Sequence, residues 1–188
     1  IQRSLLAGDQ QTGVTIMEVV PKLDAGAMVS KGIIPIGERD TAQSLHDGLA
    51  SIGANLMLEA MNKLALEGHL ASTPQDESLV TYAEKLQKSE AAIDWNHCAA
   101  QISKQVRAFN PFPVAQAILN GEVCRIWMAT AKPGVGVAGQ VVAAQETIDV
   151  ACREGILSIE ELQLPGGKRL KARDFLSGNP LPIGTQFN

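Results

Sequence analysis

The sequence is poor in aromatic residues and has no long hydrophobic run. The first shortage restricts the composition of the core, and the second argues against a transmembrane protein. Aromatic residues make up 4% of the 188 residues, so aliphatic side chains must supply most of any core. The apolar runs, such as Val19–Pro21 and Ile33–Pro35, fall far short of the ~20 residues that a transmembrane helix needs. No secretory signal is visible either. We therefore expect no membrane partner.

Cysteine is also scarce. Cys98, Cys124 and Cys152 are widely spaced, odd in number and never form a C-x-x-C pair. This spacing argues against a disulfide framework or a zinc site and favours the reducing cytoplasm. We therefore expect three buried, unreactive thiols, no metal and a cytoplasmic location.

The composition that remains is that of a folded protein, with 45% apolar and 19% charged residues. This balance supports a core and excludes a disordered tail, and the length suits one large domain or two small ones. The net charge of −4 gives no global sign of a nucleic-acid partner. Residues 96–188 nevertheless carry nine basic against seven acidic residues, a mild excess compatible with a phosphate-bearing partner.

The first 70 residues predict a helix end, two strands and a long helix. Alternating β-branched residues such as Val14 and Ile16 favour a strand, and Gly68 is typical of a helix end. The expected elements are a helix end at Ile1–Ala7, strands at Gly13–Val20 and Met28–Ile36, a loop at 21–26, and a helix from Asp40 or Thr41 to about Glu67.

Residues 71–92 are polar and predict a linker, and residues 93–188 predict a second domain. Asp94 or Asn96 can cap a helix over His97–Phe109, which Asn110-Pro111 would end. Asn120-Gly121 is a strong hairpin signal. One helix followed by short strands with glycine turns predicts a small β-barrel. The expected strands are Val114–Leu119, Glu122–Thr130, Gly139–Ala144, Thr147–Cys152, Gly155–Glu161 and Leu162–Leu164, before a short helix at Lys171–Leu176.

Two blocks of the sequence resemble the methionyl-tRNA formyltransferases, and their order makes the resemblance specific. The first block leads through a strand into an L-D-x-G loop, and the second resembles the junction between that family's catalytic domain and its C-terminal barrel. The matching residues are Ile1–Asp9, Thr12–Met17 and Leu23–Gly26 in the first block, and Thr81–Ala83 with Lys85, Ile93–Trp95 and Val106–Pro113 in the second.

The resemblance implies a partial α/β nucleotide-fold domain over residues 1–70, followed after the linker by an OB-like barrel over residues 93–188. It implies transfer of a formyl group from 10-formyltetrahydrofolate to the methionine of initiator methionyl-tRNA by a monomeric enzyme. Asp24 would be the catalytic carboxylate. The loop that lines the folate pocket would comprise Leu23, Asp24, Ala25 and Gly26.

The resemblance also indicates what the chain does not contain. The family completes its active site with an Asn and a His on an upstream N-x-H segment, and none of His46, His69 and His97 lies in such a motif. The chain opens on Ile1, so we expect it to begin inside a longer protein and to be inactive alone. Ala27 stands where the family often has Asp, beside the matched loop.

Several alternatives stay open. From the residues alone, Asp24 could be an ordinary turn or cap carboxylate, and Trp127 is expected in the core. The densest basic cluster could be a solvated surface or a tRNA contact, and alternation along a strand would align its last three members. The protein could instead formylate a sugar nucleotide, or the chain could be only an RNA-binding module. The cluster comprises Lys168, Arg169, Lys171 and Arg173.

Overall fold

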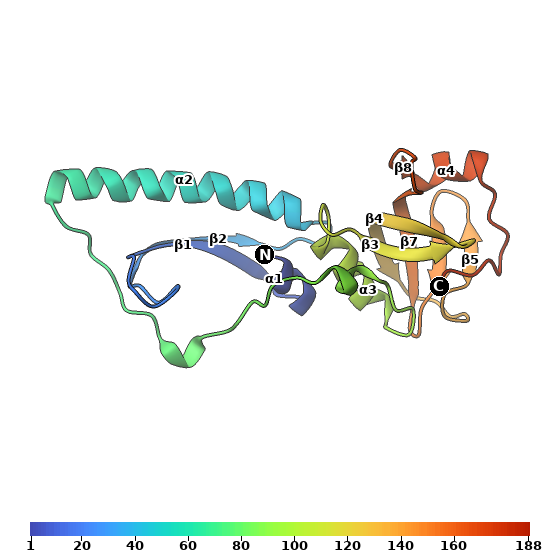
Figure 1. Ribbon diagram of the computed structural model, residues 1–188, viewed down its shortest axis with the longest axis horizontal. Helices are drawn as coiled ribbons and strands as arrows, with labels where there is room; N and C mark the ends of the chain where they lie inside the picture. Colours follow the sequence, from blue (N-terminus) through green and yellow to red (C-terminus); the bar gives the residue numbers. More distant parts are fainter. The chain divides into compact units, whose positions relative to one another are not determined.

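The computed structural model describes all 188 residues, and their contacts divide them into two units (Figure 1). The first unit contains Ile1 and residues 9–84, and the second contains residues 2–8 and 85–188. The chain changes units after residues 1, 8 and 84, and only the last of these points lies within the predicted linker. The assignment of domains to 1–70, 71–92 and 93–188 stays a prediction. None of the helices combines the length and apolarity required to cross a bilayer.

The first unit is built on an antiparallel hairpin. Strand β1 (Gln11–Met17) pairs with β2 (Met28–Pro35), with Gln11 opposite Pro35 and Met17 opposite Met28. Both predicted strands are present, but β1 lies two to three residues earlier than the prediction. The register shifts after Ile16, so Glu18 no longer belongs to the ladder and begins the connecting loop.

Helix α2 (Ala42–Glu67) runs along this hairpin (Figure 1). The predicted cap is confirmed at Thr41: its hydroxyl oxygen accepts from the Ser44 amide, and its own amide donates to the Ser44 hydroxyl. Gly68 ends the helix at φ 74°, donating to the Leu64 carbonyl. A side chain on Gly32 would overlap Ile52, so the glycine lets helix and strand approach closely. A 3₁₀ turn, η1 (Glu77–Leu79), lies in the segment that follows this helix.

In the second unit two helices precede the sheet. Helix α1 (Gln2–Ala7) contacts α3 (Ala99–Ala108), and Arg3 binds Glu90 of the 3₁₀ turn η2 (Lys88–Ala91). The predicted cap of α3 was wrong: Cys98 occupies that position. Asp94 instead accepts from the amide of Asn96 and so stabilises the turn before the helix.

The sheet of the second unit has the order β3-β4-β7-β6-β5, with β8 paired to β7. The Asn120-Gly121 hairpin is confirmed, with positive φ at both residues. The two strands expected between 155 and 164 form one continuous strand, β7. The bounds are β3 (Ala115–Leu119), β4 (Glu122–Lys132), β5 (Val141–Ala144), β6 (Ile148–Ala151), β7 (Ile156–Gln163) and β8 (Leu170–Lys171), before α4 (Ala172–Gly178).

This order leaves β3 and β5 as the ends of an open path. No closed barrel is therefore found, and the predicted OB-like barrel is not confirmed. The C-terminal residues contact both ends. Phe187 forms a bridge with Leu119 of β3, and Gln186 forms one with Gln140, next to β5. The Gly/Pro-rich tail has no strand pattern, so this pairing could not be predicted from the sequence.

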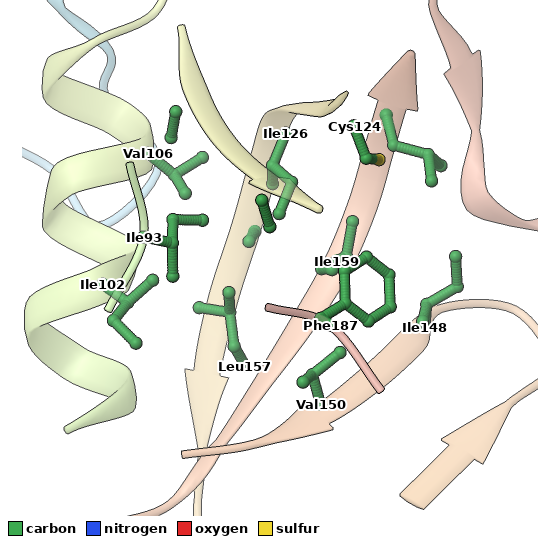
Figure 2. Close-up of a cluster of buried hydrophobic side chains, with 14 of the residues drawn as sticks. Ile93, Ile102, Val106, Cys124, Ile126, Ile148, Val150, Leu157, Ile159 and Phe187 are labelled. Carbon is green, nitrogen blue, oxygen red and sulfur yellow. The ribbon is translucent and has the colours of Figure 1, made fainter. Parts of the chain in front are cut away.

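The core of the second unit is aliphatic, as the scarcity of aromatic residues required. Figure 2 shows Ile102 and Val106 of α3 facing Ile126 and Leu157 of the sheet. Phe187 lies farther from the helix, beside Ile148, Val150 and Ile159. Trp95 is also buried and meets Phe187 edge to face, with ring centroids 5.8 Å apart.

Candidate active-site loop and basic cluster

The loop between β1 and β2 exposes Asp24. Its backbone lies in the left-handed region at φ 52°, a conformation that Asp tolerates better than most non-glycine residues. The side chain of Asp24 is exposed, as is that of Leu23, at 87% of its full area. Ala25 is half-buried. An exposed carboxylate next to an exposed apolar side chain can orient a partner group and contact an apolar ligand surface.

Gly26 keeps this loop tight. It is buried, and a Cβ there would overlap the carbonyl oxygen of Glu18. The amide of Glu18 donates to Ala27 across the base of the loop, over 2.9 Å. Since no side chain fits at this position, the glycine holds the two ends of the loop together.

A second segment lies against the loop, although it is far away in the sequence. Thr73 exchanges two backbone hydrogen bonds with Met28, of 2.7 and 2.9 Å, and Ser72 donates to Glu18 over 2.6 Å. The carboxamide nitrogen of Gln75 donates to the carbonyls of Asp24 and Gly26, each over 2.8 Å. The sequence gives no sign of this role for Gln75, because the polar stretch around it predicts only a linker.

The histidines make their own contacts away from this loop. The ring of His46 meets Asp47, that of His69 meets the Glu67 carbonyl, and that of His97 lies 4.0 Å from Asp94. No group of three or more Cys, His, Asp and Glu side chains gathers in a way that could hold a metal. Within this chain the loop therefore supplies one carboxylate, without a histidine partner.

The predicted basic cluster is divided among three elements. Lys168 lies in the turn after β7, Lys171 ends β8, and Arg173 lies on α4, 3.6 Å from Glu146. The expected alternation along one strand was wrong, because the strand ends at Lys171 and a helix begins at Ala172.

Arg169 differs from Lys168 and Lys171 because its charge is already paired. Its Nε donates to Glu161 over 2.6 Å, and its guanidinium lies 4.8 Å from the Trp127 ring centroid. Trp127 is only half-buried and donates from its indole nitrogen to Gln163, so its expected core position was wrong. Lys168 and Lys171 are the exposed members with no such partner.

Two of the three cysteine thiols are buried, as expected. Cys124 and Cys152 are buried, and burial raises their pKa values to about 12 and about 11, respectively. Both are therefore protonated and poor nucleophiles near neutral pH. Cys98 departs from the prediction, since it is only partly buried.

Two family models match the chain. The model described as "Formyl transferase, C-terminal domain" matches residues 85–180, more than half of the sequence. The model described as "Formyl transferase" matches residues 1–61 and so contains the Asp24 loop.

Among curated proteins, methionyl-tRNA formyltransferase of Methylobacillus flagellatus is 65% identical over 187 residues. The alignment covers 100% of this chain but 61% of that protein. The enzyme of the same name from Dechloromonas aromatica is 46% identical over 189 residues, covering 100% of this chain and 60% of the relative. The chain thus spans about three fifths of the length of these relatives.

Solved structures share the fold at lower identity. HypX from Aquifex aeolicus in complex with tetrahydrofolic acid superposes with a TM-score of 0.72 at 19% identity, over 100% of this chain and 35% of that one. An N-formyltransferase from Helicobacter canadensis, in complex with folinic acid and dTDP-3-aminofucose, gives 0.67 at 18% identity, over 89% and 59%.

Proposed function

Because the chain belongs to the formyl transferase family, we propose that the full-length protein formylates the methionine of initiator methionyl-tRNA. The formyl donor is 10-formyltetrahydrofolate, and the enzyme acts in the cytoplasm as a monomer. The 65% identity to a methionyl-tRNA formyltransferase along the whole chain carries this proposal. The exposed Asp24 carboxylate, on a loop held by Gly26 and Gln75, supports it.

In the reaction, the amino nitrogen of methionine attacks the formyl carbon and forms a tetrahedral intermediate. The bond from that carbon to N10 of the folate then breaks, while one proton leaves the amine and one reaches N10. Such a step needs a positioned proton acceptor and stabilisation of the oxyanion. Asp24 orients the upstream His that the family resemblance implies, and organises proton transfer. Leu23, Asp24, Ala25 and Gly26 line the donor pocket.

The second unit binds the tRNA in this proposal, as an OB-like domain over residues 93–188. An open sheet whose ends are both contacted by the C-terminal residues supports this class. Lys168, Lys171 and Arg173 are exposed and meet phosphates, while Arg169 is held by Glu161 and Trp127. Few aromatic side chains are exposed in this unit, so recognition is of the RNA backbone and shape.

A second candidate is formylation of a sugar nucleotide, favoured by the fold shared with the Helicobacter canadensis enzyme. The two functions are separated by offering the full-length protein 10-formyltetrahydrofolate with methionylated initiator tRNA, the same tRNA uncharged, or a dTDP-amino sugar. We expect transfer to the charged tRNA alone. A higher kcat/KM for the sugar nucleotide would overturn the proposal.

A further inference from the structure

We propose that Gln75 is a positioning residue for the Asp24 loop, an inference that rests on the proposed function. Its carboxamide nitrogen lies 2.8 Å from the carbonyl oxygens of both Asp24 and Gly26. A carbonyl oxygen only accepts hydrogen bonds, so only the NH₂ end of the side chain can face both atoms. The two N–H groups of one side chain thus bind both ends of the segment 24–26, which carries the carboxylate and is called the arc of the loop below.

This arc needs such support because its backbone is locally unfavourable. Asp24 lies at φ 52°, a region that few non-glycine residues adopt, although Asp tolerates it better than most, and contacts from neighbouring segments help to hold it there. Gly26 restrains one end of the arc through its close approach to Glu18. The bonds from Gln75 restrain the Asp24 peptide itself and therefore the direction of its side chain.

Gln75 is also distinguished by its burial within residues 71–80, the segment that follows α2. Of the ten residues from Ala71 to Val80, Gln75 alone is half-buried, and the other nine are exposed. The segment is also tied to the loop by the Thr73–Met28 backbone pair and by Ser72. The Lys22–Glu77 ion pair is exposed on both sides, and such pairs contribute little. Gln75 therefore acts mainly on main-chain atoms of the loop, with one further contact to the sulfur of Met17 over 3.9 Å. None of these atoms belongs to the core of the second unit, so loss of Gln75 leaves that core unchanged.

The chemistry of the two bonds predicts an order of effects among substitutions. In Gln75→Ala the two carbonyls return to water and the loop loses its restraint. In Gln75→Glu the shape is kept, but an ionised carboxylate faces two carbonyl oxygens and donates nothing. A side chain that merely fills space would tolerate Glu better than Ala, whereas a donor to two carbonyls predicts that Glu is at least as harmful.

The test uses the full-length protein with methionylated initiator tRNA and 10-formyltetrahydrofolate. We expect Gln75→Ala and Gln75→Glu to lower kcat about 10- to 100-fold, since small misplacements of catalytic groups have effects of this size. The KM for tRNA should change less than about twofold, because interactions with phosphates elsewhere set that affinity. Glu77→Gln, which removes only the exposed ion pair with Lys22 in the same segment, is the matched control and should retain most of kcat.

Amide hydrogen exchange supplies a readout that does not depend on turnover. In both Gln75 variants the amides of residues 24–28 should exchange faster, while the thermal midpoint stays near that of the wild type. The role of Gln75 would be overturned if the wild type is active and both Gln75 variants keep its kcat. It would also be overturned if Gln75→Glu alone matches the wild type. A wild type that transfers no formyl group to the tRNA would instead overturn the proposed function.

Discussion

Asp24 and Gln75 are the residues on which the proposed site depends, and they differ in how visible they are in a sequence. Asp24 lies in a short L-D-x-G motif next to a recognisable strand, so its loop could be predicted. Gln75 acts through a single side chain, 51 residues away from Asp24. It lies between the stretches 1–61 and 85–180 that the family models match, in a segment without periodic pattern.

Asp149 is the clearest buried charge of the second unit. Its carboxylate accepts from Lys132, Thr147 and Ser158, over 2.6, 2.9 and 2.7 Å. Burial alone would raise the pKa of Asp149, but these three hydrogen bonds outweigh it and the pKa lies below its ordinary value. Asp149 thereby links strands β4, β6 and β7 through one ionised group.

We predict that Asp149→Asn lowers the stability of the protein at pH 7 by about 1–3 kcal/mol, the usual range for buried polar groups that lose a partner. A lowered native pKa gives stability that is present above the unfolded value of ~3.9 and lost as pH falls through the native value. The gap between variant and wild type should therefore close on acidification, in thermal melts from pH 7 downward. Glu122→Gln, at an exposed position, is the control. If the difference in stability between wild type and Asp149→Asn does not change with pH, the ionised carboxylate of Asp149 is not the source of that stability.

At the scale of elements, capped and periodic structure could be predicted from the sequence. Helix α2 and the Asn120-Gly121 hairpin lie where Thr41, Gly68 and the turn dipeptide place them. The open sheet and its bridges to the C-terminal tail could not be predicted, because pairing between residues as distant as Leu119 and Phe187 leaves no local pattern. The start of α3 was likewise misjudged, because Cys98 and not Asp94 or Asn96 occupies its N-cap position.

The basic cluster belongs to this scale because its members lie on a turn, a short strand and a helix. Reversing Lys168 and Lys171 to Glu should weaken binding of initiator tRNA. The slope of log K against log salt should also fall by about one for each phosphate that the protein no longer neutralises. Lys168 and Lys171 make a cleaner test than Arg169, whose reversal would also break its pairing with Glu161 and Trp127.

The matched control for that experiment reverses Lys88 and Arg153, which are exposed on other parts of the second unit and change the net charge equally. We expect this control to keep most of the salt slope. A cluster variant with an unchanged slope would assign Lys168 and Lys171 to the solvated surface.

At the scale of the whole molecule, the chain consists of two units that divide the proposed work. The first carries the Asp24 loop and the segment with Gln75, and the second carries the aliphatic core, the open sheet and the basic cluster. Chemistry and RNA binding should therefore respond to substitution independently, since additivity holds for sites without shared partners.

The most direct test of this account is Asp24→Asn in the full-length protein, measured for formyl transfer and for tRNA binding on the same preparation. The substitution keeps the shape of the side chain but removes its charge and its capacity to accept a proton. We predict that transfer to methionylated initiator tRNA falls by at least about 10³-fold, within the range seen when an orienting carboxylate of a catalytic triad is neutralised. The Kd for the tRNA should stay within about twofold of the wild type. Transfer at near the wild-type rate would remove Asp24 from the mechanism and contradict the central claim.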